Sequence, residues 1–124
     1  MKRLLFLLTV LILAACSSQT NTPATTYAVK DVSSVKEFTM TAKNWEFEPS
    51  TITVNQGDAV KLTVKSVDVE HSFALPDYSI NVNLQPGVEE TIEFVADKKG
   101  EFTFKCSVYC GAGHREMKGT LIVK

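Results

Sequence analysis

The sequence lacks the features that mark several large classes of protein. Its 13 basic and 14 acidic residues nearly cancel, so it has no excess of positive charge of the kind that nucleic-acid binding requires. Its longest apolar stretch, residues 4–13, is about half of the ~20 residues that a membrane-spanning helix needs. There is no internal repeat and no helical hydrophobic period, and a length of 124 residues allows one domain. We therefore expect one small domain that does not bind nucleic acid.

Cysteine is scarce, and the first of the three cysteines stands apart from the other two. Cys16 follows a charged start at Lys2-Arg3, an apolar stretch at residues 4–13 and two alanines, which is the pattern of a secretory signal with a lipobox. We predict that residues 1–15 are a lipoprotein signal peptide and that Cys16 carries the lipid. The protein would then sit on a membrane surface outside the cytoplasm. The alternatives are an ordinary cleaved signal and a short uncleaved anchor.

Polar residues dominate the segment after Cys16. Residues 17–34 are rich in Ser, Thr, Asn and Gln and show little apolar periodicity, so they bury too little surface to order themselves. We predict a lipidated flexible tether over residues 16–34 and a folded domain over residues 35–124. Without Lys2 and Arg3 the chain keeps 11 basic and 14 acidic residues, a net charge of −3. A mildly acidic surface suits a basic partner.

Strand patterns begin at Val35. Apolar and polar residues alternate in short stretches that are separated by turn residues such as Gly57 and Pro86-Gly87. The stretches are residues 38–42, 52–54, 60–65, 89–96, 102–105 and 120–124. Short strands at this spacing, with no helical period, predict an all-β protein with an antiparallel sandwich or barrel.

The metal-binding chemistry of the chain is concentrated between Cys106 and Met117, where the sequence reads CSVYCGAGHREM. Two thiols, one imidazole and one thioether are ligands that suit copper, above all Cu(I). A mononuclear blue-copper site needs only one cysteine, so the second thiol is surplus to it, and two thiolates could bridge two metals. The other interpretations are a mononuclear copper site, a zinc site with two Cys and two His, and a disulfide between Cys106 and Cys110.

This loop resembles the CuA loop of cytochrome c oxidase subunit II, most closely the short subunit II of the ba3-type oxidases. The upstream segment SVDVEHSF, which contains His71, is similar to the family segment that carries the first histidine ligand. The Pro86-Gly87 turn and the segment GTLIV from Gly119 resemble the turn and the closing strand that follow. The resemblance implies an all-β, cupredoxin-like Greek-key β-sandwich.

The resemblance also implies a dinuclear CuA centre with two copper ions per chain. Its ligands come from one strand end and one loop: His71, Cys106, Val108 (through its backbone carbonyl), Cys110, His114 and Met117. Cys106 and Cys110 would bridge both ions as thiolates. Each ion would be completed by one histidine and one weak ligand.

The function that the resemblance implies is a one-electron relay from a cytochrome c-like donor to subunit I of a haem–copper oxidase or a similar acceptor. No independent catalysis is expected, because nothing in the loop forms a nucleophile–base pair or leaves a coordination position for a substrate. The chain would be either an oxidase subunit or a free-standing relay. One alternative is a copper-binding protein that delivers or stores copper for oxidase assembly. The other is an enzyme domain like the C-terminal CuA domain of nitrous-oxide reductase, but 124 residues leave no room for its catalytic propeller.

Three positions depart from typical subunit II. Val108 stands where an acidic side chain usually reaches a magnesium ion, although the ba3 type also lacks the acid. Asn81 and Asn83 stand where a Lys-x-Asp pattern is usual before the Pro-Gly turn. The acidic docking features of the family are therefore not expected in this chain.

The sequence is compatible with two placements for each of two aromatic residues. Trp45 either packs with Phe47 in the core or is a surface aromatic near the copper loop that helps to dock a partner. Tyr109 is interpreted as a core residue or as a residue beside the metal, not as a redox-active one.

Overall fold

The computed structural model describes residues 33–124. The expected signal peptide, the lipidation of Cys16 and nearly all of the expected tether lie outside the described residues. Ser33 and Ser34, the last two residues of that tether, are hydrogen-bonded to the domain: Ser33 N–H donates to the Gly57 carbonyl at 3.0 Å, and the Ser34 carbonyl accepts from Ala59 N–H at 2.8 Å. Within the described part, no helix is long and apolar enough to cross a membrane.

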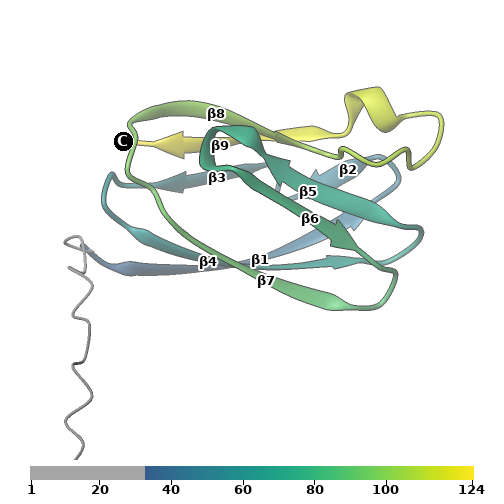
Figure 1. Ribbon diagram of the computed structural model, residues 1–124, viewed down its shortest axis with the longest axis horizontal. Helices are drawn as coiled ribbons and strands as arrows, with labels where there is room; N and C mark the ends of the chain where they lie inside the picture. Colours follow the sequence, from purple (N-terminus) through teal and green to yellow (C-terminus); the bar gives the residue numbers. More distant parts are fainter. Residues whose placement is uncertain (1–32) are drawn as a thin grey trace, which may run out of the picture.

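The described chain folds into two packed β-sheets with two short 3-10 turns (Figure 1). One sheet has the strand order β2-β1-β4-β7 and the other has the order β3-β9-β8-β5-β6. The strands are β1 (Val35–Lys43), β2 (Glu46–Glu48), β3 (Thr51–Val54), β4 (Ala59–Ser66), β5 (His71–Leu75), β6 (Ile80–Leu84), β7 (Glu89–Val95), β8 (Gly100–Lys105) and β9 (Lys118–Val123), and the turns are η1 (Pro76–Tyr78) and η2 (His114–Glu116). The prediction of an all-β, cupredoxin-like sandwich is confirmed.

The sheets are mixed, so the prediction of purely antiparallel pairing is wrong. β1 pairs in parallel with β4, and β3 pairs in parallel with β9, whereas the other neighbouring strands pair antiparallel. Alternation of polar and apolar residues reports which face of a strand is buried, but it carries no information about the direction of the neighbouring strand.

The six predicted stretches fall in β1, β3, β4, β7, β8 and β9. Alternation did not predict β2, β5 or β6, although the resemblance implied a strand end at His71, the first residue of β5. β5 has no visible alternation because all five of its residues are buried. The metal-binding loop covers its outer side, where Ser72 Oγ accepts hydrogen bonds from Ser107 N–H at 2.6 Å and Val108 N–H at 3.3 Å. A strand that is buried on both faces reads as a short apolar run, which periodicity alone does not identify.

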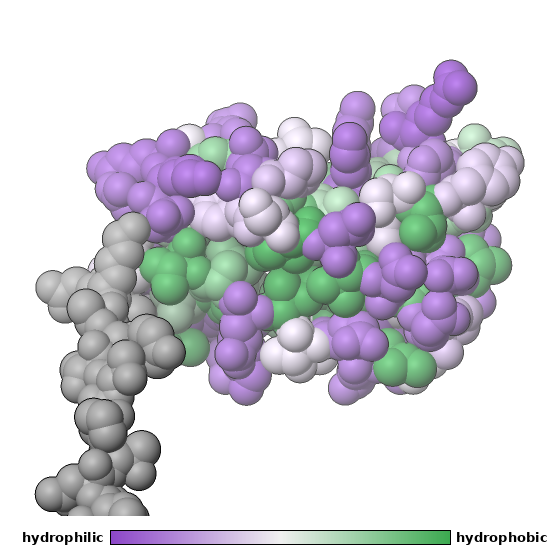
Figure 2. All heavy atoms as spheres, in the orientation of Figure 1, coloured by the Kyte–Doolittle hydropathy of each residue, from purple (hydrophilic) through white to green (hydrophobic). Residues whose placement is uncertain are grey.

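Three phenylalanine rings at the centre of the sandwich join the two sheets. The ring of Phe47 lies 6.0 Å from that of Phe73 and 5.3 Å from that of Phe104, and the rings of Phe73 and Phe104 stack at 5.1 Å. Full burial of such a side chain stabilises a fold by roughly 1.5–3 kcal/mol. Figure 2 shows hydrophobic residues gathered in a band between the two sheets, with hydrophilic residues on either side.

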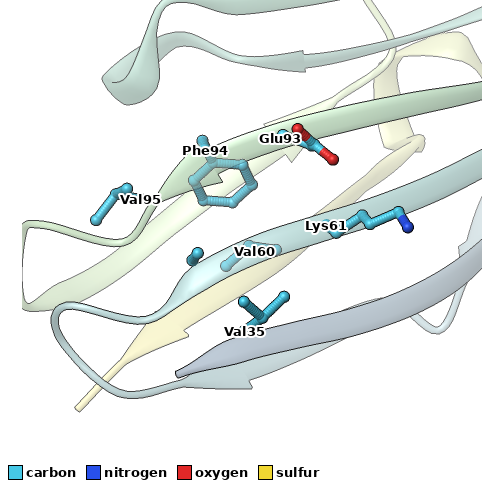
Figure 3. Close-up of a pocket in the computed structure, with 7 residues that line it drawn as sticks. Val35, Val60, Lys61, Glu93, Phe94 and Val95 are labelled. Atoms are coloured by element: carbon cyan, nitrogen blue, oxygen red, sulfur yellow. The ribbon is translucent and has the colours of Figure 1, made fainter. Parts of the chain in front are cut away.

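A shallow apolar hollow lies at the end of β4 that is remote from β5. It has a volume of about 360 Å³, and Figure 3 shows the side chains that line it on three neighbouring strands. Val35, Val60, Phe94 and Val95 contribute apolar surface, and a charged pair of residues flanks them. The hollow and the metal-binding loop are therefore at opposite ends of the sandwich.

Asp58 ties the start of β4 to two earlier parts of the chain. Its carboxylate accepts hydrogen bonds from Asn55 N–H at 2.9 Å and from Ser34 Oγ at 2.7 Å. The backbone hydrogen bond from Asn55, and then the one from Ser34, lower the pKa of Asp58 from its ordinary 3.8, although burial acts to raise it. Asp58 therefore stabilises the fold when it is ionised.

Stability is therefore expected to fall in acid, in part through Asp58. A carboxyl whose pKa is lower in the folded chain contributes stability above its unfolded pKa, and this contribution is lost as the pH falls through the folded pKa. In metal-free protein, the urea midpoint of wild type should decline between about pH 5 and pH 3, and the Asp58→Asn variant should show a smaller decline. Asp77→Asn serves as the control for a carboxylate without these bonds. Equal pH dependence in wild type and Asp58→Asn would contradict this assignment.

Candidate metal centre

The candidate metal centre is built from the loop between β8 and β9 and from the start of β5. Cys106 follows the last residue of β8, and Met117 precedes the first residue of β9. The Cys106 N–H donates to the Met117 carbonyl at 3.1 Å, which extends the β8–β9 ladder beyond its last pair, Lys105 and Lys118. The two ends of the loop are therefore held by the sheet itself.

Small residues let the middle of the loop fold tightly. Gly111 has φ +126°, a conformation that other residues rarely adopt, and its carbonyl accepts a hydrogen bond from His114 N–H at 3.1 Å. The ring of Trp45 lies directly on this backbone: a Cβ atom on Gly111 or Gly113 would come within 2.9 or 2.5 Å of it. Trp45 Nε1–H also donates to the Cys110 carbonyl at 3.2 Å. The indole therefore fixes the side of the loop that carries Cys110 and His114.

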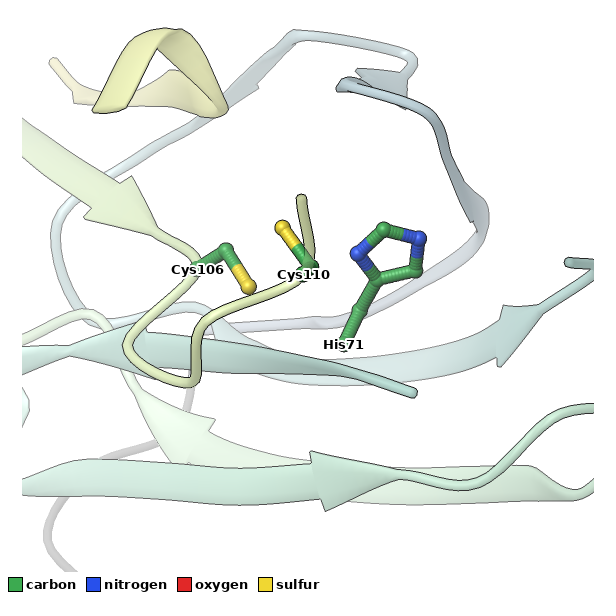
Figure 4. Close-up of side chains that lie close together, drawn as sticks. All are labelled: His71, Cys106 and Cys110. Atoms are coloured by element: carbon green, nitrogen blue, oxygen red, sulfur yellow. The ribbon is translucent and has the colours of Figure 1, made fainter. Parts of the chain in front are cut away.

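Three buried side chains bring their ligand atoms together. His71, Cys106 and Cys110 each offer one atom, and these atoms lie within 4.8 Å of one another. Figure 4 shows the two sulfurs and one ring nitrogen of His71 facing a common space. Both cysteines are free thiols, so the structure contains no Cys106–Cys110 disulfide.

The remaining candidate ligands surround the same sulfurs. His114 Nδ1 lies 3.6 Å from Cys110 Sγ, and Met117 Sδ lies 3.8 Å from it. The carbonyl oxygen of Val108 lies 3.2 Å from Cys106 Sγ. The structure thus brings together all six residues that the resemblance implies as ligands, each through a donor atom of the implied kind.

The ring of His71 is oriented by Asp68. His71 Nε2 lies 2.7 Å from Asp68 Oδ1, so Nε2 carries the proton that the carboxylate accepts and Nδ1 keeps its lone pair. Burial acts to raise the pKa of Asp68, but hydrogen bonds from Val69 N–H, Asn44 N–H and His71 outweigh it, so the pKa is lowered. The carboxylate is therefore held in the ionised form that orients the imidazole.

The other nitrogen of His71 has no partner. Within residues 33–124, His71 Nδ1 is the only buried side-chain nitrogen or oxygen atom without a hydrogen bond, and the residue is 0% exposed. An unpaired buried polar atom costs about 1–3 kcal/mol, and a lone pair that faces two thiols is the arrangement that a metal ion would satisfy.

The donor set fits copper. Two thiols, two imidazoles and a thioether are soft or borderline ligands, and a thioether has no role in a zinc site. Burial, followed by the hydrogen bond and charge of Cys106, raises the pKa of the Cys110 thiol to about 11. The thiol is thus protonated in the metal-free chain at neutral pH, and a metal ion would displace that proton.

For each of two aromatic residues, the structure excludes one of the two placements that the sequence left open. Trp45 is 39% exposed and packs on the loop, so the interpretation that it packs in the core with Phe47 is wrong, whereas Phe47 itself is in the core. Tyr109 is 81% exposed and its ring lies 5.8 Å from that of His114, so its placement as a core residue is also wrong. Both are instead aromatic surface next to the candidate ligands.

Asp68 and Ser72 are the supporting residues that sequence reasoning missed. Ser72 Oγ lies 2.8 Å from Ser107 Oγ and 3.9 Å from Cys106 Sγ, in addition to its bonds to the loop backbone. Ser107 in turn donates to Asn81 Oδ1 at 2.9 Å. The only signal in the sequence is that Asp68 and Ser72 flank the histidine in the segment SVDVEHSF.

Replacement of Asp68 by asparagine is expected to weaken copper binding by about 10- to 100-fold, because the variant loses the carboxylate that fixes the tautomer of His71. Competition with a chelator of known copper affinity measures the change. Glu70→Gln is the matched control, since Glu70 lies in the same loop and its one side-chain hydrogen bond within residues 33–124 comes from Gln85 Nε2, at 2.9 Å. Equal affinity in the Asp68 variant and wild type would show that the carboxylate does not act on the metal.

The fold and this donor set define the class of protein. The sequence profile of the cupredoxin-like domain family matches residues 4–123, so the chain belongs to that family.

Two curated proteins are similar in sequence to this chain. Cytochrome c oxidase subunit 2 of Thermus thermophilus is 37% identical over 78 residues, which cover 63% of this chain and 58% of that protein. Nitrous-oxide reductase of Stutzerimonas stutzeri is 33% identical over 100 residues, which cover 77% of this chain and 16% of the reductase. The chain thus spans 58% of the length of the oxidase subunit and much less of the reductase.

A solved structure indicates the same family relationship. A chain of a haem–copper terminal oxidase dimer superposes with a TM-score of 0.66 and 27% identity, over 72% of this chain and 65% of that chain. The domain is therefore a cupredoxin-like domain homologous to cytochrome c oxidase subunit II.

Proposed function

We propose that this protein is a one-electron relay that works through a dinuclear CuA centre. His71, Cys106, Val108, Cys110, His114 and Met117 would hold two copper ions, with the thiolates of both cysteines as bridges. The observation that carries the proposal is the convergence of these donors on two buried sulfurs, with His71 Nδ1 left unpaired toward them. When bound, two coppers that share bridging sulfurs would spread one electron over both metals.

The chain would keep the ligands nearly fixed during a redox step. Cys106 and Met117 are tied by a hydrogen bond at the end of the β8–β9 ladder, and Asp68 orients His71. The indole of Trp45 packs on the loop backbone at Gly111 and Gly113. A preorganised site with locked ligands changes little between redox states, which favours fast transfer.

The surface around the centre supports a docking role. Five large hydrophobic side chains at this end of the domain are exposed: Trp45, Val67, Val69, Val88 and Tyr109. They belong to the loops that surround the start of β5, and an exposed apolar patch of this kind is typical of an interaction site. We propose that a cytochrome c-like donor docks over Trp45, and that the acceptor is subunit I of a haem–copper oxidase or a similar protein. We do not propose that the chain catalyses a reaction by itself.

The proposed location is outside the cytoplasm, on a membrane surface. It rests on the signal-like residues 1–15 and the lipobox cysteine Cys16, which lie outside the described residues. A lipid on Cys16 would anchor the domain, and residues 17–32 would connect it to the membrane.

The test is an optical and EPR spectrum of the copper-loaded chain, with the metal counted per chain. The expected result is a purple protein with two coppers and a seven-line EPR signal. A blue protein with one copper would replace the proposal with a mononuclear cupredoxin. A colourless protein that holds zinc, or that holds no metal and forms a Cys106–Cys110 disulfide, would overturn electron transfer altogether.

A second candidate function is copper storage or delivery for oxidase assembly. One observation favours it: a solvent-accessible hollow reaches Cys106, His114 and Met117, which would let a metal ion enter or leave. A delivery protein should lose its copper to an external chelator within the time of mixing, whereas a relay should retain it. Retention of copper over hours of exposure to the chelator would exclude delivery.

A further inference from the structure

A hollow of about 350 Å³ lies beside the candidate metal centre. Cys106, His114 and Met117 line one part of it, so it lies directly against the ligands. The cationic residues Lys105, Arg115 and Lys118, together with the polar residues Thr103 and Ser107, make up the rest of the lining, and no acidic residue lines it. We refer to Lys105, Arg115 and Lys118 as the basic face.

The basic face is not neutralised by the rest of the described domain. Lys43 and Lys61 have carboxylate partners at 2.8 and 3.3 Å, respectively, whereas no residue of the basic face forms an ion pair within residues 33–124. All three of its side chains are exposed. Its charges are therefore available to a partner.

The arrangement of the basic face costs stability. Lys105 and Lys118 are directly opposite each other in the β8–β9 ladder. Like charges in this position are destabilising. A negatively charged partner that contacted both lysines would remove this repulsion. The lysine pair is therefore explained by binding of such a partner and not by its contribution to the stability of the domain.

We propose that the basic face docks the carboxylate-rich surface of a protein redox partner against the His114 edge of the centre. This inference rests on the proposed relay function, and it adds the charge of one partner and the side from which that partner approaches. The net charge of the chain favours a basic partner, and the donor proposed above docks over the exposed side chains around Trp45. The basic face is a separate surface, and its positive charge suits a second, acidic partner.

The chemistry of the surroundings favours a protein over a small anion. The three cations are exposed on the rim of an open hollow, so none of them could enclose a free phosphate. Arginine is enriched at the centres of protein interfaces, and Arg115 is part of this face. The open, exposed arrangement of the face therefore favours a protein surface over a small anion.

A binding experiment tests the basic face without electron transfer. The full chain is titrated with a hexaglutamate peptide and, separately, with inorganic phosphate at equal ionic strength, and amide NMR shifts are followed in the reduced copper-loaded and the metal-free protein. We expect the peptide to shift Lys105, Arg115 and Lys118, and the Lys105→Gln/Arg115→Gln/Lys118→Gln variant to lose this response. The Lys99→Gln variant, changed in an exposed turn at the other end of β8, should retain it. Binding of phosphate alone, or peptide binding that survives in the triple variant, would overturn the proposal.

A kinetic experiment uses the sign of the salt dependence. Hexacyanoferrate(II), an anionic one-electron donor, is mixed with the oxidised copper-loaded chain at rising ionic strength. If the negative net charge of the chain controls the encounter with the anion, the rate of electron transfer should rise with salt. If the basic face steers the anion, the rate of electron transfer should fall with salt. In that case the triple variant should be slower than wild type by roughly tenfold at low salt. A rate that rises with salt in wild type would contradict the basic face.

The two proposals can fail separately. If the chain holds no copper pair, the spectrum shows this and the peptide titration of the metal-free chain still tests the basic face. If the spectrum shows the copper pair but the peptide does not bind, the relay stands and the acidic partner does not.

Discussion

Replacement of Cys110 by serine is expected to eliminate the copper pair. Cys110 Sγ is the atom around which His114 Nδ1, at 3.6 Å, and Met117 Sδ, at 3.8 Å, are arranged, and it is one of only two thiols in the cluster. A serine hydroxyl is a hard, neutral donor that neither bridges two coppers nor suits Cu(I). The variant should hold at most one copper per chain, lose the purple colour and the seven-line EPR signal, and transfer electrons at no measurable rate.

The fold should survive this change. The thiol of Cys110 is not part of a disulfide, and a change from sulfur to oxygen at a small side chain costs only about 1–2 kcal/mol. Circular dichroism of the metal-free variant should therefore match that of metal-free wild type. Cys16→Ser is the matched control, because it replaces a cysteine of the same chain outside the loop and should leave two coppers per chain. A purple Cys110→Ser protein with two coppers would exclude bridging by this thiolate.

Replacement of Gly119 by alanine is expected to have the largest effect on stability. A Cβ atom at Gly119 would lie 2.4 Å from the ring of Phe104 and 2.5 Å from the Ser50 carbonyl oxygen. Neither neighbour can move easily. The ring of Phe104 is 0% exposed and packs against the rings of Phe47 and Phe73. The Ser50 oxygen belongs to the backbone and accepts a hydrogen bond from Thr120 N–H at 2.8 Å.

The cost should lie at or above the upper end of the range for overpacking, about 3 kcal/mol. For a domain of this size, that corresponds to a fall in melting temperature of roughly 12–24 °C. Thermal and urea unfolding of the metal-free chain measure it. Gly87→Ala is the control: nothing lies within 4 Å of its Cβ position, so only the strain of its φ of +80° remains, about 1 kcal/mol. A Gly119 variant no less stable than the Gly87 variant would show that the core relaxes around the added methyl group.

The candidate site was predictable in its composition because its donors are local in sequence. Cys106, Cys110, His114 and Met117 lie within a single loop, and side chains a few residues apart in a tight loop must lie close together. His71 was predictable only through the resemblance, because its distance along the chain from the loop says nothing about its distance in space. The geometry agrees with both inferences, since His71 Nδ1 faces the two sulfurs.

The fold class and six of the strands followed from the sequence, because burial of one face imposes a period of two on each strand. The direction of β1 against β4 did not follow from it, and alternation did not reveal β2, β5 or β6. Direction depends on the path of the chain between the sheets, and β5 loses its alternation because the loop at Ser107 and Val108 covers its outer face.

The sequence by itself determined the class of the domain, the composition of its metal-binding loop and the distribution of soft donors within it. Only the tertiary structure decided which atoms support those donors and which surfaces surround them. It brought Asp68 to the ring of His71, placed Trp45 on the loop backbone, left Tyr109 in solvent and set Lys105 opposite Lys118 beside the ligands. The physical reason is that periodicity and spacing record local geometry, whereas these contacts join loops and strands through packing and strand register, which no short stretch of sequence encodes.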